Sequence, residues 1–115
     1  MKVVINIVIM LFCITAFSQE QKVDYKKVDN GLVKATYYFV DNNTIIEREG
    51  FFNKEGKLHA TWISYDIQGN KTVVANYKNG KKEGVWTYFK KDKINVVTYN
   101  KNKIINVEEK SLVVN

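Results

Sequence analysis

The stretch "GKKEGVWTYF", Gly80 to Phe89, decides the fold, because a second stretch of the chain repeats its layout. "GKLHATWISY", Gly56 to Tyr65, begins with the same glycine and lysine and carries a tryptophan at the same offset. A glycine and charged residues followed by an aromatic cluster indicate a turn that leads into a β-strand. A layout that recurs at this distance is typical of an array of supersecondary units.

Alignment on the glycines extends the repeat to three units, 31–55, 56–79 and 80–102. A large aromatic residue follows each first glycine after six positions. A closing aromatic comes 15 residues later in the first two units and 13 residues later in the third, and loops tolerate such differences in length. The repeat positions are Gly31, Gly56 and Gly80, then Tyr37, Trp62 and Trp86, then Phe52, Tyr77 and Tyr99.

Each unit is predicted to form a β-hairpin. The aromatic clusters predict first strands at Thr36–Val40, Thr61–Asp66 and Val85–Phe89, and β-branched residues predict second strands at Thr44–Ile46, Thr72–Ala75 and Ile94–Thr98. The predicted fold is therefore all-β, a meander of antiparallel hairpins over residues 31–115. A partial fourth unit, 103–115, ends it, and a lead-in segment, 19–30, precedes it.

Alternation along a strand predicts that Tyr37, Trp62 and Trp86 share one face of the sheet. A single hairpin is marginally stable in water, whereas hairpins in series can bury a continuous apolar ladder. Tyr65 and Phe89, three residues after the tryptophans, are predicted to project from the opposite face.

The N-terminus predicts export. Lys2 precedes an apolar run from Val3 to Phe17, and the small residues Ala16 and Ser18 precede Gln19, as in a cleaved signal peptide, 1–18. An uncleaved membrane anchor and a lipoprotein with lipid on Cys13 are the alternatives. The run is short for a membrane span, and Cys13 lies inside it. The expected destination is the periplasm, the outer-membrane periphery or the extracellular space.

The formal net charge of the 115-residue chain is +6, of which Lys2 contributes one. Lysines scattered among acids indicate a solvated surface first and an anion-binding surface second. Lys57, Lys81 and Lys82 each follow a unit's first glycine, so we expect them along one edge of the sheet, as a candidate surface for an anionic partner. The exposed aromatics Tyr65 and Phe89 are the alternative surface.

Residues that could carry chemistry are few. His59 is the only histidine and the only cysteine lies in the predicted leader, so the mature chain has no Cys–His pair, and a Ser–His–Asp triad could be built only from His59 with Ser64 or Ser111, which no motif singles out. We therefore predict no enzymatic activity, no catalytic, metal or cofactor-binding residues, and no cofactor. Binding of nucleic acid is disfavoured, because the repeat spacing explains the aromatics as core.

The stretch "YKNGKKEGVWTYF", Tyr77 to Phe89, resembles the bacterial variant of the MORN repeat, "Y-x-N-G-K-x-x-G-x-W-x-x-Y", and some proteins with this repeat are catalogued as YwqK-type antitoxins. Gly84 matches the second glycine of the pattern, whereas Ala35 and Ala60 stand at that position in the other units, and Asn102 replaces the next first glycine. The leader resembles those of secreted Bacteroidota proteins.

The resemblance implies an elongated single sheet used as a scaffold or binding surface, without catalytic residues. We expect a non-catalytic exported repeat protein that binds another protein at the cell envelope. An antitoxin or immunity-like partner of a toxin and a peripheral binder of anionic lipid are the alternatives.

Overall fold

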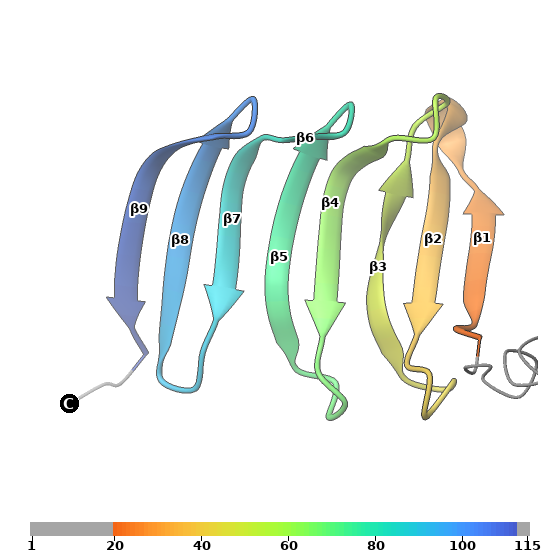
Figure 1. Ribbon diagram of the computed structural model, residues 1–115, viewed down its shortest axis with the longest axis horizontal. Helices are drawn as coiled ribbons and strands as arrows, with labels where there is room; N and C mark the ends of the chain where they lie inside the picture. Colours follow the sequence, from red (N-terminus) through yellow and green to blue (C-terminus); the bar gives the residue numbers. More distant parts are fainter. Residues whose placement is uncertain (1–19, 113–115) are drawn as a thin grey trace, which may run out of the picture.

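The computed structural model describes residues 20–112, which form one open antiparallel sheet in meander order (Figure 1). The predicted leader and its cleavage site lie outside the described residues. The strands are β1 Val23–Lys27, β2 Val33–Tyr38, β3 Ile46–Phe52, β4 Leu58–Tyr65, β5 Lys71–Lys78, β6 Lys81–Lys82, β7 Gly84–Phe89, β8 Lys93–Asn100 and β9 Lys103–Ser111, with a short 3-10 turn at Asp29–Gly31. The predicted all-β meander of hairpins is confirmed.

The three predicted hairpins are present as β2–β3, β4–β5 and β7–β8. The second strand of the first unit was placed wrongly: it spans Ile46–Phe52 and not Thr44–Ile46. The side chain of Asn42 accepts hydrogen bonds from the backbone N–H and the hydroxyl of Thr44, which holds this threonine in the loop. A side chain that bonds its own backbone two residues on competes with strand pairing.

The segment 19–30, predicted as a lead-in, contains a strand of the sheet. β1 pairs with β2 from Val23 opposite Tyr37 to Lys27 opposite Val33. At the other end β9 pairs with β8, as expected for the partial fourth unit. Among residues 20–112, β1 and β9 are therefore the two edge strands.

The loops lie alternately at the two ends of the strands (Figure 1). The turns that separate the units lie at the top in this view, and the loops within units lie at the bottom. The β4–β5 loop spans residues 66–70 and the β7–β8 loop only 90–92, so the third unit loses its two residues in a loop, as predicted.

Backbone conformation shows why the repeat needs its glycines. Gly84 has a φ of +77°, in the left-handed region, and the equivalent Ala60 has a φ of +61°. Asn102, which replaces a first glycine, has a φ of +71°. The fold thus imposes the glycine conformation on these two other residues, whereas Ala35 lies inside β2, paired with Gly50.

The buried side chains form a stripe along one face of the sheet, here called the ladder face. The most buried are Ala35, Trp62, Ala75, Trp86 and Val97, with Tyr37, Phe52, Leu58, Val73, Tyr77, Tyr88 and Tyr99 packed against them. The predicted aromatic ladder is confirmed. None of residues 20–112 belongs to a helix long and apolar enough to cross a membrane.

Candidate functional site

The two tryptophans occupy equivalent positions and hold the sheet together. Trp62 donates its Nε1–H to the carbonyl of Phe51 at 2.9 Å, and Trp86 donates to the carbonyl of Asn76 at 2.8 Å, each on the preceding long strand. Both are only 5% exposed. A buried indole with its single donor satisfied is a structural residue, so neither tryptophan is available to a partner.

Each tryptophan also contacts the closing aromatic of the preceding unit, edge to face. The ring centroids lie 5.1 Å apart for Phe52 and Trp62, and 5.1 Å apart for Tyr77 and Trp86. Tyr99 closes the last unit and packs on Trp86 at 5.2 Å. The aromatic residues at the predicted repeat positions therefore make the contacts that join one unit to the next.

Gly50 is a structural residue that the sequence analysis missed. A Cβ atom at this position would lie 2.0 Å from the Trp62 ring, so the indole rests directly on the glycine backbone. Ala75 lies at the corresponding position of β5 and is buried beside Trp86. A glycine inside a strand pattern is the signal that could have found it, because it marks a close approach.

His59 has a structural role at the turns. Its Nδ1 accepts the backbone N–H of Asn79 at 3.1 Å. Glu83, the equivalent residue of the next unit, accepts the backbone N–H of Lys101 at 2.8 Å. The same position in both units thus provides an acceptor for the following turn, and the histidine occupies a slot that a carboxylate also fills.

The unit-separating turns carry a row of exposed lysines, here called the lysine rim. It comprises the turns after β3, β5 and β8, with Lys54, Lys57, Lys78, Lys81, Lys101 and Lys103 exposed. Two glutamates, Glu55 and Glu83, lie among them. Lys57 and Lys81 belong to this row, as predicted.

Two expectations about these lysines need correction. The rim lies at the ends of the strands, not along an edge strand, because turns between antiparallel strands collect there (Figure 1). Lys82 does not point away with the others: its ammonium lies 4.9 Å from the Trp86 ring and 5.1 Å from the Tyr99 ring. Its cation–π contacts make it part of the ladder face.

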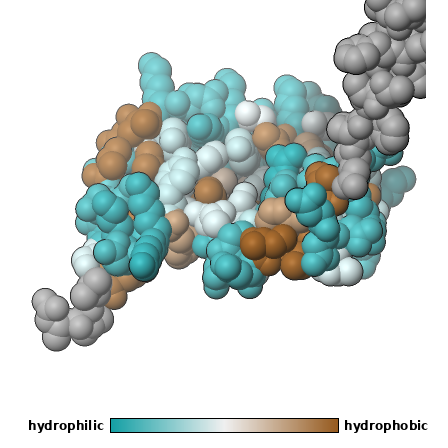
Figure 2. All heavy atoms as spheres, turned by 60° about the horizontal axis from the view of Figure 1, so that its bottom comes forward, coloured by the Kyte–Doolittle hydropathy of each residue, from teal (hydrophilic) through white to brown (hydrophobic). Residues whose placement is uncertain are grey.

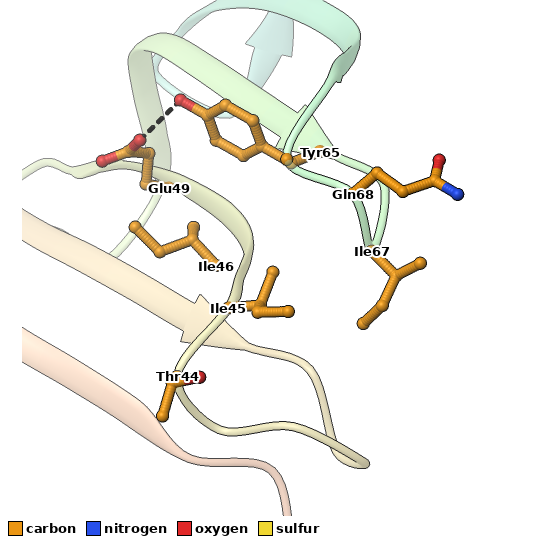
Figure 3. A pocket seen from close by; sticks show the side chains of 8 residues that line it. Thr44, Ile45, Ile46, Glu49, Tyr65, Ile67 and Gln68 are labelled. Carbon is orange, nitrogen blue, oxygen red and sulfur yellow. Dashed lines mark hydrogen bonds between the residues drawn. The ribbon is translucent and has the colours of Figure 1, made fainter.

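The opposite face has a shallow cleft of about 420 Å³ between two loops at the bottom of the sheet (Figure 3). Its apolar wall comes from Ile45, Ile46 and Ile67. At its back the Tyr65 hydroxyl donates to Glu49 at 2.7 Å. This hydrogen bond to the carboxylate, with burial, raises the pKa of Tyr65 to about 12.

Glu49 is not a reactive carboxylate. One oxygen accepts from Tyr65 and the other lies 3.6 Å from the ammonium of Lys34. With both oxygens engaged, the cleft offers apolar contact and no unpaired base. It is suited to an aliphatic side chain.

Tyr65 and Phe89 both lie on the face opposite the ladder, but the structure does not bring them into one site. Phe89 is 38% exposed and lies in a separate depression with Lys71, Lys90 and Lys91. Two separate aromatics of this kind are weaker candidates for a recognition surface than the continuous lysine rim.

Over the described part of the chain, no group of three histidine, cysteine or acidic residues could hold a metal ion. No protein-family model, curated protein or solved structure matches the sequence. The surfaces that remain to be explained are the lysine rim, which can bind a partner by charge, and the cleft, which can bind one by apolar contact.

Proposed function

We propose that the chain is a non-catalytic, exported repeat protein of the MORN type that binds an acidic partner protein at the cell envelope through the lysine rim. One observation carries the proposal: on three successive turns at one end of the strands, six exposed lysines outnumber two glutamates. A surface of one sign steers an oppositely charged partner and fixes its orientation.

Hydrogen bonds link neighbouring turns of the rim, which favours recognition over simple solubilisation. Asn53 donates its side-chain amide to Asn79 at 2.9 Å, which links two neighbouring turns. The backbone N–H of Gly80 donates to Leu58 at 2.7 Å. Because the linked turns keep the lysine backbones at a fixed spacing, binding a partner costs less conformational entropy.

The opposite ends of the strands differ in charge balance. The loops there carry Lys71, Lys90 and Lys91 among the three aspartates Asp41, Asp66 and Asp92. These three lysines are thus balanced by three aspartates. The same protein therefore supplies a control surface with exposed lysines but without the excess of positive charge.

The turn geometry supports the MORN-like assignment, because Ala60 and Asn102 have positive φ at glycine positions of the pattern, although Ala35 of the first unit does not. Export rests on the pattern of residues 1–18. An antitoxin role rests on the family label alone, and an adjacent toxin-like reading frame would favour it.

The test is affinity capture from the native envelope fraction with residues 19–115, with partners identified by mass. The variant Lys57→Gln, Lys78→Gln, Lys81→Gln should lose most of a stoichiometric acidic partner. Capture of that partner by the parent protein should weaken as salt rises. The matched control Lys71→Gln, Lys90→Gln, Lys91→Gln removes the same charge and should retain it. Equal retention by both variants would reject the rim as the binding surface.

A peripheral lipid-binding role is the second candidate, because the same rim could meet anionic headgroups at about 1 kcal/mol per lysine near the surface. Sedimentation with vesicles that contain or lack anionic lipid separates the two roles. Vesicle binding that the rim variant abolishes, without any captured protein, would favour the lipid.

A further inference from the structure

The two outer edges of the sheet carry the most exposed apolar side chains of the described residues. Tyr25 on β1 is 63% exposed, and Ile104, Ile105 and Val107 on β9 are 59%, 62% and 61% exposed. Figure 2 shows apolar side chains gathered at the β9 end of the molecule. Among residues 20–112, no strand lies against the outer side of either β1 or β9.

Hydrogen bonds at the strand ends define which backbone groups point outward. The carbonyl of Lys22 accepts the N–H of Tyr38, so the backbone groups of Lys22 face β2. Alternation along the strand therefore turns the backbone groups of Tyr25 and Lys27 outward, away from the sheet. The backbone N–H of Leu112 donates to the carbonyl of Asp92 on the β8 side. Alternation along the strand therefore turns the backbone groups of Val107 and Glu109 outward, away from the sheet.

The outward groups of the two edges fit one another. Tyr25 opposite Glu109 and Lys27 opposite Val107 would exchange backbone hydrogen bonds in an antiparallel pair. That register sets Asp24 opposite Lys110 and Lys26 opposite Glu108. Val107 pairs with the ladder residue Val97, and Tyr25 pairs with the ladder residue Ala35, so both charge pairs meet on the face opposite the ladder.

We propose that β9 of one copy pairs with β1 of a second copy in this register. Cross-strand pairs of opposite charge stabilise a sheet, and like charges directly opposite destabilise it. A shift of two residues one way sets Asp24 opposite Glu108, and a shift the other way sets Lys26 opposite Lys110. A shift of one residue turns the ladder face of the second copy over.

The contact joins two different surfaces, so it does not close on itself. Each added copy leaves one β1 edge and one β9 edge open, and such a head-to-tail contact yields a series of oligomers and not a closed dimer. The ladder face continues across the junction, which covers the exposed side chains of Tyr25 and Val107. The charges at the two edges thereby specify one register for the growing sheet.

Cysteine cross-linking tests the register directly. Positions 26 and 108 would form a non-hydrogen-bonded pair, with Cα atoms about 4.5 Å apart, which a disulfide can span. The full-length chain, with Cys13→Ser, is expressed as Lys26→Cys and as Glu108→Cys, and cells are treated with copper–phenanthroline. We expect covalent dimers when the two variants are co-expressed, and little cross-linking from either alone.

The double variant Lys26→Cys, Glu108→Cys should give a ladder of dimers, trimers and longer species. The register control pairs Asp24→Cys with Glu108→Cys and should cross-link several-fold less. Absence of dimers from the co-expressed pair would overturn the proposal. So would equal cross-linking by Glu108→Cys alone, which would indicate a closed β9–β9 dimer.

A charge swap gives an answer that does not depend on disulfides. Lys26→Glu should weaken self-association about fivefold, as expected for replacing an attractive pair by a repulsive one. Addition of Glu108→Lys should restore it. Both side chains are exposed, so folding should be unaffected, and circular dichroism checks this. Failure of the second change to restore association would contradict the proposed register.

Discussion

The second and third units, 56–79 and 80–102, solve the same structural problem with different residues. Both place a tryptophan on the ladder face with its N–H bonded to the preceding long strand, at 2.9 Å and 2.8 Å. Both pack it against the preceding closing aromatic at 5.1 Å. The contact geometry is the same although the two stretches differ at many positions.

The differences lie where the backbone sets the requirement. Ala60 and Gly84 both adopt positive φ, although alanine rarely does so. Gly50 and Ala75 both lie beside a ladder tryptophan, and the Trp62 ring leaves no room for a Cβ atom at Gly50. The comparison teaches that the repeat conserves positions and conformations within this chain more closely than residue types.

The largest expected effect is truncation of the ladder. Trp62→Ala and Trp86→Ala should each destabilise residues 19–115 by roughly 3–5 kcal/mol, as for large aromatic side chains in cores. Similar losses in denaturant melts would confirm that the units are equivalent. A cost below about 1 kcal/mol at either site would show that this tryptophan is dispensable to packing.

The residues beneath the rings should respond unequally. Gly50→Ala should cost about 1–3 kcal/mol, because the new methyl group must displace the Trp62 ring. Ala75→Gly should cost only about 1 kcal/mol, mainly through backbone entropy in a strand. Denaturant midpoints of the two variants test this, and a neutral Gly50→Ala would mean that the ring moves aside freely.

The positive-φ positions should show effects of opposite sign. Ala60→Gly should stabilise the protein by about 1 kcal/mol, because glycine adopts this conformation without strain. Gly84→Ala should destabilise the protein by a similar amount. A Cβ atom added at Gly84 would lie 3.9 Å from its nearest neighbour, the Cβ atom of Asn76, so the substitution tests backbone strain and not crowding. Thermal melts that move in the same direction would contradict the equivalence of the two positions.

Alkaline pH should distinguish Tyr65 from the equivalent Phe89. Because the pKa of Tyr65 is raised to about 12 in the folded protein from about 10 in the unfolded chain, its hydrogen bond to Glu49 contributes in full below pH 10 and is lost as pH rises from 10 to 12. Burial raises the pKa of Tyr88 to about 12 as well, so part of the alkaline loss remains without Tyr65.

Tyr65→Phe should therefore lower the stability of the protein by about 1 kcal/mol near neutral pH. Above about pH 10, the stability of the variant should fall less steeply with pH than that of the parent protein. Melts at several pH values measure both slopes. Parallel slopes would show that the phenol–carboxylate contact is absent in solution.

The glycine-led phrase was sufficient to predict the sheet, the hairpins and the tryptophan ladder, because these follow from short-range alternation. It could not reveal β1, whose "VDYKK" is short, charged and paired only through the tertiary fold. The second strand of the first unit was predicted to begin too early, at Thr44, because spacing alone does not show that the Asn42 side chain holds this threonine in the loop. The position of Lys82 over two rings and the contact of Gly50 with Trp62 depend on neighbouring strands, which spacing alone does not fix.

Hydrogen–deuterium exchange of the two indole N–H groups, followed by NMR on residues 19–115, is the most direct test of the tryptophan ladder. If each ladder tryptophan donates to the preceding long strand, both indole protons should exchange slowly, with similar protection that is lost only when the sheet opens. Exchange of either indole proton at the rate of a solvent-exposed tryptophan would show that this tryptophan does not hold the two units together.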